Sequence, residues 1–238
     1  MAVTLYVVAA SHPCFAAARA LELKRIPYRR VEWPPVMHAA IQRALFGERT
    51  VPALSLDGER IVGSRPIMHR LDELQPEPPL YPDPRVEEAD RWGDEVLQPI
   101  PRRVVWWAFR RHPAAIRSFA ANSRIPLAGP TVKALVPVIA PISWHLNEVD
   151  DEAVRRDVEA LPEHLDRVDR WIGQGVLGGD PPNAADLQIG ASIALLRMHE
   201  DLEPLIRGRP AAQLAAHFPT YRGRVPAGVL TPVVDLPA

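Results

Sequence analysis

A proline-rich segment divides this sequence into two parts with different hydrophobic patterns. In QPEPPLYPDP, residues 75–84, five of ten residues are proline. Proline removes a backbone donor and fixes φ, so such a segment is extended and continues neither a helix nor a central strand. We therefore predict a linker at residues 77–84, between a first domain at residues 1–76 and a second at residues 85–238. The 238 residues of the chain are enough for two small domains.

The segments before the linker alternate between strand and helix patterns. TLYVVAA, residues 4–10, is a continuous apolar run, which is typical of a strand buried on both faces. FAAARALELKR, residues 15–25, consists mainly of good helix formers. YRRVEW, residues 28–33, predicts a second strand, and an irregular stretch follows it. The first third of the chain therefore begins in the order β-α-β.

Two further strands and a helix complete this first part. VPALSLDGERIV, residues 51–62, predicts two short strands joined at Asp57-Gly58, a dipeptide that favours hairpin turns. SRPIMHRLDEL, residues 64–74, opens with a serine able to cap a helix and has an early proline. The order β-α-β followed by β-β-α predicts an α/β domain of the thioredoxin-like class.

The sequence after the linker contains no convincing strand pattern. Apolar residues recur at helical spacing between Val154 and Ile172, which predicts an amphipathic helix. A second helix is predicted over residues 183–198, with Asn183 as its N-cap and Asp186 in the capping-box position.

Two more segments of this second part have helical patterns. Residues 84–112 and 201–217 both favour helix, and we expect the first to bend near Pro99 and Pro101. The sequence therefore predicts an all-α domain after the linker.

The composition excludes several classes of function. A formal net charge of -1 does not suit a nucleic-acid-binding protein. A single cysteine excludes an internal disulfide and a cysteine-cluster metal site, and the eight histidines show no metal-ligand spacing. We expect no nucleic-acid partner and no bound metal.

The termini and the most apolar segment predict the cellular location. The N-terminal sequence MAVTLYVVAASHP has no basic region and too short an apolar run for a signal peptide. Residues 125–146 are the most apolar segment, but four prolines and a lysine interrupt them, so we expect no membrane-spanning helix. A single thiol is compatible with a reducing compartment, and we expect a cytoplasmic protein.

The junction Ser11-His12-Pro13-Cys14 carries the chemistry that the sequence indicates. Free N–H groups and the helix dipole at a strand-to-helix junction stabilise an anion, so thioredoxin-like proteins place a Cys-x-x-Cys pair there. Here Ser11 occupies the first position and Cys14 the second. Disulfide exchange therefore lacks its attacking thiol, and we expect Cys14 to be a small buried residue of the helix. The other interpretation of Ser11 is a simple helix cap.

Several segments resemble one known family. LYVVAASHPCFAAARALELKRIPYRRVEW, residues 5–33, resembles the start of serine-type glutathione transferases, especially the theta and zeta classes. TVPAL at 50–54, GSRPIMHRLDEL at 63–74 and NAADLQIGA at 183–191 resemble further motifs of that family, in the same order. Residues 100–150 match none of them. The resemblance implies a thioredoxin-like N-terminal domain joined to an all-α C-terminal domain.

The resemblance also implies roles for individual residues. The Ser11 hydroxyl would donate to the sulfur of glutathione and favour its thiolate form. Val51, which precedes a Pro52 that the family holds in cis, would pair its backbone with the cysteinyl part of the peptide. Ser64 would bind the γ-glutamyl carboxylate at the start of the next helix, and Arg65 would belong to the same glutathione-binding set.

The resemblance is weaker around the two carboxylates of glutathione. Arg49 and His38 would face the glycine carboxylate, although both residue types are more often solvated in loops. Gly63 stands where the family has an acidic residue, and Pro66 removes a backbone N–H near the γ-glutamyl site. The co-substrate is therefore glutathione or another low-molecular-weight thiol.

A pocket for the second substrate is expected in the helical domain. Trp106 and Phe109 are candidates for its wall, although Trp106, Trp107 and Phe109 at this spacing also fit a helix core. His12 is expected at the rim of the site.

We predict an enzyme, a glutathione S-transferase-like homodimer that uses a thiolate to attack a small electrophile or to catalyse a thiol-dependent isomerisation. The first alternative is a non-catalytic binding or scaffold protein that keeps the fold. The second is a thiol-disulfide oxidoreductase that works through Cys14.

Overall fold

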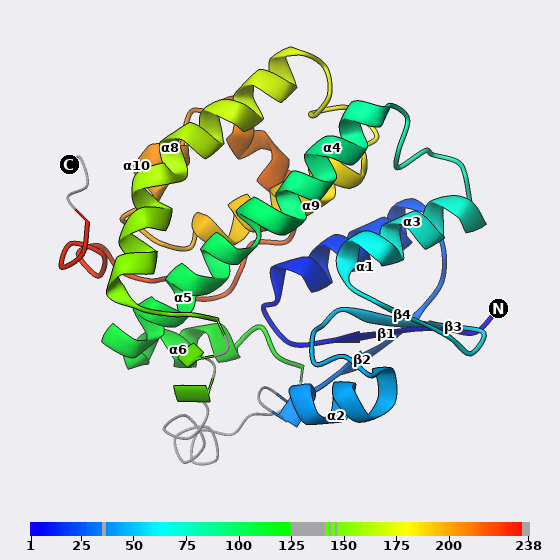
Figure 1. Cartoon of the computed structure of the whole chain (residues 1–238), viewed down its shortest axis with the longest axis horizontal. Coiled ribbons are helices and arrows are strands. Elements are labelled where there is room, and N and C mark those ends of the chain that lie inside the picture. The colour runs from blue at the N-terminus through cyan, green and yellow to red at the C-terminus, as the bar shows by residue number, and fades with distance from the viewer. Residues whose placement is uncertain (35–36, 125–140, 143, 146, 235–238) are drawn as a thin grey trace.

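The computed structural model describes the chain except residues 35–36, 125–140, 143, 146 and 235–238. Most of the apolar segment at 125–146 and the last residues of the chain therefore lie outside the described residues. Figure 1 shows a small sheet with its helices beside a larger group of helices, which confirms the predicted thioredoxin-like domain and all-α domain. In the described residues, no helix is long and apolar enough to cross a membrane.

The N-terminal domain is built on a four-stranded mixed sheet. Its strands are β1 (Val3–Val7), β2 (Arg29–Glu32), β3 (Ala53–Leu56) and β4 (Glu59–Val62), in the order β2-β1-β3-β4. β1 pairs parallel to β2 and antiparallel to β3, and β3 and β4 form an antiparallel hairpin. The predicted hairpin is confirmed, with positive φ angles of 48° and 94° at its Asp-Gly turn.

Strand β1 is shorter and less buried than its apolar sequence predicts. It ends at Val7 because the chain turns at Ala10, whose φ is 59°. Its side chains alternate between buried and half-buried, so the prediction of burial on both faces was wrong. The half-buried face is aromatic: Tyr6 stacks on Trp33 and packs edge-on against Phe46.

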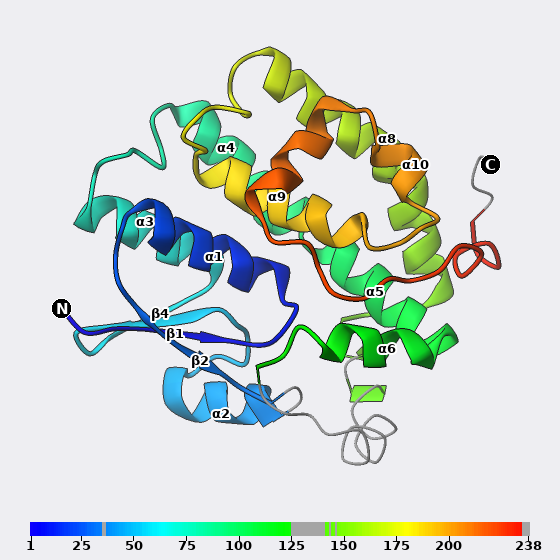
Figure 2. The ribbon, with the colours of Figure 1, turned by 180° about the vertical axis from the view of Figure 1, so that it is seen from behind.

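Three helices flank the sheet. Helices α1 (His12–Leu23) and α3 (Ser64–Leu74) lie on one face, and α2 (Met37–Phe46) lies on the other (Figure 2). The sequence had indicated only an irregular stretch at α2. This helix is tied down by the buried Gln42, which accepts from Trp33 Nε1 at 3.2 Å and donates to the Thr50 carbonyl at 2.9 Å.

The longest described helical segments of the second domain, with one short helix near the C-terminus, follow in chain order. They are α4 (Pro84–Trp92), α5 (Pro99–Arg111), α6 (Pro113–Ala120), α8 (Asp151–Gly173), α9 (Ala184–Leu196) and α10 (Glu203–Ile206). The predicted helix over 201–217 is only partly α-helical, because a 3₁₀ helix occupies Pro210–His217.

The bend predicted near Pro99 and Pro101 lies further towards the N-terminus. A π-helical turn at Gly93–Leu97 joins α4 to α5, and Pro99 begins the new helix, where its missing donor costs nothing. A Cβ atom at Gly93 would lie 2.9 Å from Ile189 Cγ1 of α9, so this close approach requires glycine.

Helix α9 lies between the two domains. Of its 13 residues 12 are buried, and they contribute to the core of the helical domain and to the core around α1 and α3. The predicted capping box forms at its N-terminus: Asp186 N donates to Asn183 Oδ1 at 3.1 Å, and Asn183 N to Asp186 Oδ2 at 2.9 Å. Asp186 also accepts from Gly178 N at 2.7 Å.

The proline-rich segment between Leu74 and Pro84 contains neither helix nor strand. The side chain of Lys24 is fully buried beneath it, with Nζ 2.6 Å from Asp72 Oδ1 and 2.6 Å from the Pro78 carbonyl. The linker is thus fixed to the N-terminal domain rather than free.

Candidate functional site

Ser11 lies at the junction between β1 and the N-terminus of α1. It is half-buried and holds the N-cap position with an extended backbone, φ -76° and ψ 113°. Its hydroxyl makes no capping hydrogen bond to the first turn of α1. The simple-cap interpretation therefore lacks its defining contact, and the hydroxyl lies at the positive end of the helix dipole.

Cys14 is buried in the first turn of α1, with 2% of its surface exposed. Burial raises the pKa of its thiol to about 11, and contacts with the Ser11 hydroxyl and the Val8 backbone oppose this shift only in part. At neutral pH the group is a thiol, which is neither a nucleophile nor a metal ligand. The second alternative, disulfide exchange through Cys14, is disfavoured.

Cys14→Ala should leave thiol-dependent activity nearly unchanged and lower the free energy of unfolding by about 1 kcal/mol, because it leaves a small cavity. Urea unfolding of both proteins measures the stability change. The native protein should also resist labelling by a thiol reagent until it unfolds. Rapid labelling under native conditions would contradict the burial of Cys14.

The sequence had suggested that His12 lies at the rim of the site, and this prediction was wrong. Only 3% of its surface is exposed, and its Nε2 lies 3.1 Å from the carbonyl oxygen of Gln98, just before α5. Burial lowers its pKa to about 3, the positive charge of Arg102 contributes, and the bond to Gln98 opposes the shift. His12 is neutral, and it joins the N-terminus of α1 to the helical domain instead of contacting a substrate.

The loop before β3 and Ser11 lie at the same end of the sheet, where β1 ends and β3 begins. Ala53 pairs with Tyr6, so Val51 and Pro52 lie close to the C-terminal end of β1. The Val51–Pro52 peptide bond is cis, as the family resemblance implies. The Pro52 carbonyl accepts from Gly63 N at 2.9 Å, which joins this loop to the start of α3.

Ser64 is the first residue of α3, and Gly63, with φ 98°, is the N-cap in place of the serine that the sequence suggested. Its side chain is 2% exposed, and Oγ has no hydrogen-bond partner among the described residues. A buried hydroxyl without a partner costs about 1–3 kcal/mol. At a helix N-terminus, an anionic ligand such as a carboxylate would supply the missing partner.

Arg65 is committed to the interface between the domains, so its assignment to glutathione binding is corrected. Its guanidinium lies 3.1 Å from Asp90 Oδ2 and 3.0 Å from Glu87 Oε1, both on α4. Asp90 is fully buried and also accepts from Tyr81 Oη at 2.9 Å. Burial raises the pKa of Asp90 to about 7, against the opposing effects of Tyr81 and Arg65.

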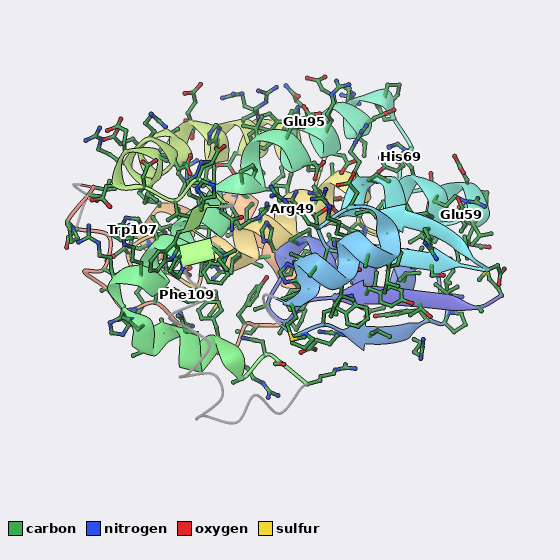
Figure 3. The ribbon with its side chains drawn as sticks, turned by 60° about the horizontal axis from the view of Figure 1, so that its bottom comes forward. Arg49, Glu59, His69, Glu95, Trp107 and Phe109 are labelled. Carbon is green, nitrogen blue, oxygen red and sulfur yellow. The ribbon has the colours of Figure 1, made fainter. Side chains whose placement is uncertain are left out.

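His38 lies in the first turn of α2, and Arg49 lies in the loop that follows this helix. Arg49 is exposed and faces the helical domain (Figure 3). It lines a cavity of about 550 Å³ together with Trp144, His145, Glu148, Val149 and Asp150. His38 lies on α2, where burial lowers its pKa. Their roles towards a glycine carboxylate stay predictions.

Of the aromatic candidates on α5, only Trp106 is available to line a pocket. Phe109 is 8% exposed and packs edge-on against Phe119 and Trp106, with ring centroids 5.0 and 5.7 Å away. Trp107 is fully buried and donates from Nε1 to Asp151 Oδ1 at 2.8 Å. Phe109 is therefore a core residue, which corrects its assignment to the pocket, whereas Trp106 is half-buried.

Two residues near the α1 N-terminus were not identified from the sequence. Arg102 is half-buried on α5, one turn before Trp106. Its i, i+4 spacing from Trp106, which places both side chains on one face of the helix, was the sequence signal that could have identified it as a site residue. Tyr221 lies near Cys14 and packs against Phe15 at 5.1 Å, and its buried hydroxyl has no partner among the described residues. No local pattern could have placed Tyr221 there.

The described residues contain no group of three or more histidine, cysteine, aspartate or glutamate side chains arranged to hold a metal ion. The candidate site combines the hydroxyls of Ser11 and Ser64 at the N-termini of α1 and α3 with the backbone of Val51 and Pro52, and the positive charge of Arg102 acts on the first turn of α1. Such groups bind and stabilise anions.

The sequence matches one family model. Residues 5–79 match the model of the glutathione S-transferase N-terminal domain. No curated protein matches the chain.

Solved structures of low sequence identity share the fold. The β-etherase LigF from Sphingobium sp. strain SYK-6 has 18% identity and a TM-score of 0.61, covering 92% of this chain and 89% of its own. A glutathione S-transferase from Rhodospirillum rubrum F11 has 21% identity and a TM-score of 0.58, covering 96% and 98%. A maleylacetoacetate isomerase from Anaeromyxobacter dehalogenans 2CP-1, with GSH in its active site, has 19% identity and a TM-score of 0.52, covering 91% and 94%.

Proposed function

We propose that the chain belongs to the glutathione transferase superfamily, whose N-terminal domain model residues 5–79 match, and that Ser11 activates the thiol of glutathione for attack on a small electrophile. The observation that carries this proposal is the Ser11 hydroxyl, which lies at the N-terminus of α1 without a capping bond. That position suits a donor to a ligand thiolate.

The required stabilisation is within reach of this arrangement. A thiol with a pKa of about 8.5 is only a few per cent ionised at pH 7. Lowering that pKa by two units takes about 2.7 kcal/mol. A charge-assisted hydrogen bond contributes about 1.5–3 kcal/mol, and a helix N-terminus adds up to about 1 kcal/mol. Ser11 and α1 together are sufficient.

The remaining candidates would hold the peptide in place. The backbone of Val51, beside the cis Pro52, would pair with the cysteinyl residue, and Ser64 would bind the γ-glutamyl carboxylate. Arg49 and His38 would bind the glycine carboxylate. The thiolate then forms a carbon–sulfur bond to the electrophile, which releases a leaving group with its electron pair or accepts the addition for an isomerisation. We further propose that the protein is cytoplasmic and forms a homodimer. Light scattering of the purified protein tests the homodimer.

Retention on immobilised glutathione, followed by a conjugation assay, tests this function. The purified protein should be retained, elute with free glutathione, and accelerate the reaction of glutathione with 1-chloro-2,4-dinitrobenzene. Acceleration should disappear when glutathione is replaced by its S-methyl derivative, which has no ionisable thiol. Retention without acceleration of this or other electrophiles would favour a binding protein.

A non-catalytic binding protein is the second candidate, and specific residues favour it. Gly63 carries no carboxylate, Pro66 has no backbone N–H, and Arg65 is already paired with Glu87 and Asp90. Each removes a contact for the γ-glutamyl group. A different low-molecular-weight thiol in the same assays distinguishes a changed thiol preference from lost catalysis. A disulfide reductase assay, with and without Cys14→Ala, tests the remaining alternative.

Ser64→Ala should separate binding from stability. We expect glutathione affinity to fall about 10- to 100-fold, because a carboxylate loses a charge-assisted hydrogen bond. The melting temperature should stay the same or rise, because the variant no longer buries an unpaired hydroxyl. Calorimetric titration and thermal unfolding measure the two effects. Lower stability with unchanged affinity would show that Ser64 has a structural role only.

A further inference from the structure

We propose that Arg102 binds an anionic group of the electrophile, so that the enzyme prefers small electrophiles carrying a carboxylate. This inference rests on the proposed transferase function and specifies its second substrate. Three observations carry it: the position of Arg102, the lack of an ion-pair partner for Arg102 among the described residues, and the cavity that Arg102 lines.

The position of Arg102 follows from the contact between α1 and the start of α5. The bond of 3.1 Å from His12 to the Gln98 carbonyl holds the first turn of α5 against the N-terminus of α1. Arg102 lies one helical turn after Gln98, on the same side of the helix. Burial is the main cause of the shifted pKa values of His12 and Cys14, and the charge of Arg102 contributes to both. Arg102 therefore lies on the side of α5 that faces the first turn of α1, near His12 and Cys14.

The positive charge of Arg102 is not neutralised by an ion pair among the described residues. The neighbouring arginines of α5 are engaged: Arg103 lies 2.9 Å from Asp157 Oδ2, and Arg111 lies 3.0 Å from Asp151 Oδ2. Arg102 forms neither an ion pair nor a hydrogen bond with the described residues, although it is half-buried. A partly buried cation of this kind favours an anionic ligand.

Two carboxylates, those of Asp94 and Glu148, lie near Arg102. Asp94 is the acidic group that acts most strongly on it, but Asp94 Oδ1 already accepts from Gln98 at 2.8 Å and from Gln188 at 3.2 Å. Glu148 is exposed and lines the same cavity. Neither forms an ion pair with Arg102, so the guanidinium can receive a ligand.

The cavity beside Arg102 has the size of a small substituent. It has a volume of about 230 Å³ and is lined by Pro99, Arg102, Arg103, Asn147 and Glu148. The half-buried Trp106 lies one turn further along α5. An aromatic acid fits this pair, because the guanidinium binds a carboxylate through two parallel hydrogen bonds and the indole provides an apolar surface.

The reaction of such a substrate leaves the carboxylate unchanged. With 4-chloro-3-nitrobenzoate, the glutathione thiolate attacks the carbon that bears chlorine and forms a carbon–sulfur bond. The carbon–chlorine bond then breaks, and chloride leaves with the bonding electron pair. Arg102 holds the carboxylate, and through it the ring, during this step.

Paired substrates test the proposal. We would measure kcat/KM for 4-chloro-3-nitrobenzoate and the neutral 4-chloro-3-nitrobenzamide, each divided by its uncatalysed rate with glutathione at the same pH. The wild-type ratio of benzoate to benzamide should exceed 10. Arg102→Met should lower it by about 10- to 100-fold, the loss of one charge-assisted pair, whereas Arg102→Lys should retain part of it. Arg91→Met, an exposed arginine of α4, is the control for net charge.

A binding measurement tests Arg102 independently of turnover. Tryptophan fluorescence titrations with 3-nitrobenzoate and 3-nitrobenzamide, which have no leaving group, should show the same charge preference and the same dependence on Arg102. The wild type could bind 3-nitrobenzoate through Arg102 and yet accelerate the reaction of glutathione with neither 4-chloro-3-nitrobenzoate nor 4-chloro-3-nitrobenzamide. In that case the proposed transferase function fails and the anion site stands.

Three results would overturn the proposal. The first is an equal benzoate-to-benzamide ratio in wild type and Arg102→Met, both of which must show native circular dichroism. The second is an equal loss of the ratio in Arg91→Met, which would indicate a general charge effect. The third is a raised KM for glutathione in Arg102→Met with an unchanged ratio, which would assign Arg102 to a carboxylate of glutathione itself.

Discussion

Ser11→Ala is expected to lower the conjugation rate near neutral pH by about 10- to 1000-fold, the range that follows removal of a donor to an anion. The fold should stay intact, because the Ser11 hydroxyl makes no capping bond in α1. Affinity for glutathione should change little, since Val51 and Ser64 hold other parts of the peptide. The pKa of the bound thiol should rise, because the hydroxyl donates only to the ionised sulfur.

The pH dependence of the rate provides the measurement. Raising the pH should restore part of the activity of Ser11→Ala, because titration supplies the thiolate that the hydroxyl no longer favours. Ultraviolet absorbance of the bound thiolate is an independent readout. Ser55→Ala, at a half-buried serine of β3 in the same domain, is the matched control. If wild type and Ser11→Ala titrate identically and only thermal stability differs, Ser11 is a helix cap and the mechanism is wrong.

Asp186→Ala is expected to lower the free energy of unfolding by about 2–4 kcal/mol, because two partly or fully buried N–H groups lose their acceptor. These belong to Gly178 and Asn183, at 2.7 and 2.9 Å from the carboxylate. The effect reaches both domains, since α9 contributes to both cores. Asn183→Ala should cost less, about 0.5–2 kcal/mol for the loss of an N-cap.

Urea unfolding followed by circular dichroism measures these losses. Asp186→Asn keeps one acceptor oxygen and should fall between wild type and Asp186→Ala, which provides a foldable variant if the alanine variant is too unstable. Glu163→Ala, an exposed residue of α8, makes the same change in net charge and should have little effect. Loss of glutathione binding by Asp186→Ala at an unchanged melting temperature would contradict the structural role of the capping box.

Much of the fold could be predicted because its determinants are local. The helix at 64–74, the hairpin at Asp57-Gly58 and the capping box of α9 depend on residues within four positions of one another. Helix α2 was missed, because its anchor is tertiary: the buried Gln42 bonds the indole of Trp33 and the Thr50 carbonyl. The amide has no signal in a helical hydrophobic pattern.

The candidate site divides in the same way. The sequence by itself determined that Ser11 stands between a strand and a helix, since apolar runs and helix formers on either side define that junction. It also determined that the single cysteine of the chain, Cys14, belongs to the helix. Both statements depend on short-range preferences of the chain.

Only the tertiary structure decided which side chains remain available. His12 and Phe109 are excluded from the site by burial, and Arg65 by ion pairs to α4. Arg102 has no ion-pair partner in the part of the chain that the structure describes, whereas Arg103, next to it in sequence, is paired with Asp157 on α8. The partners that decide each case come from elements far away in the chain. Their packing, rather than the local sequence, determines whether a polar group is satisfied or left for a ligand.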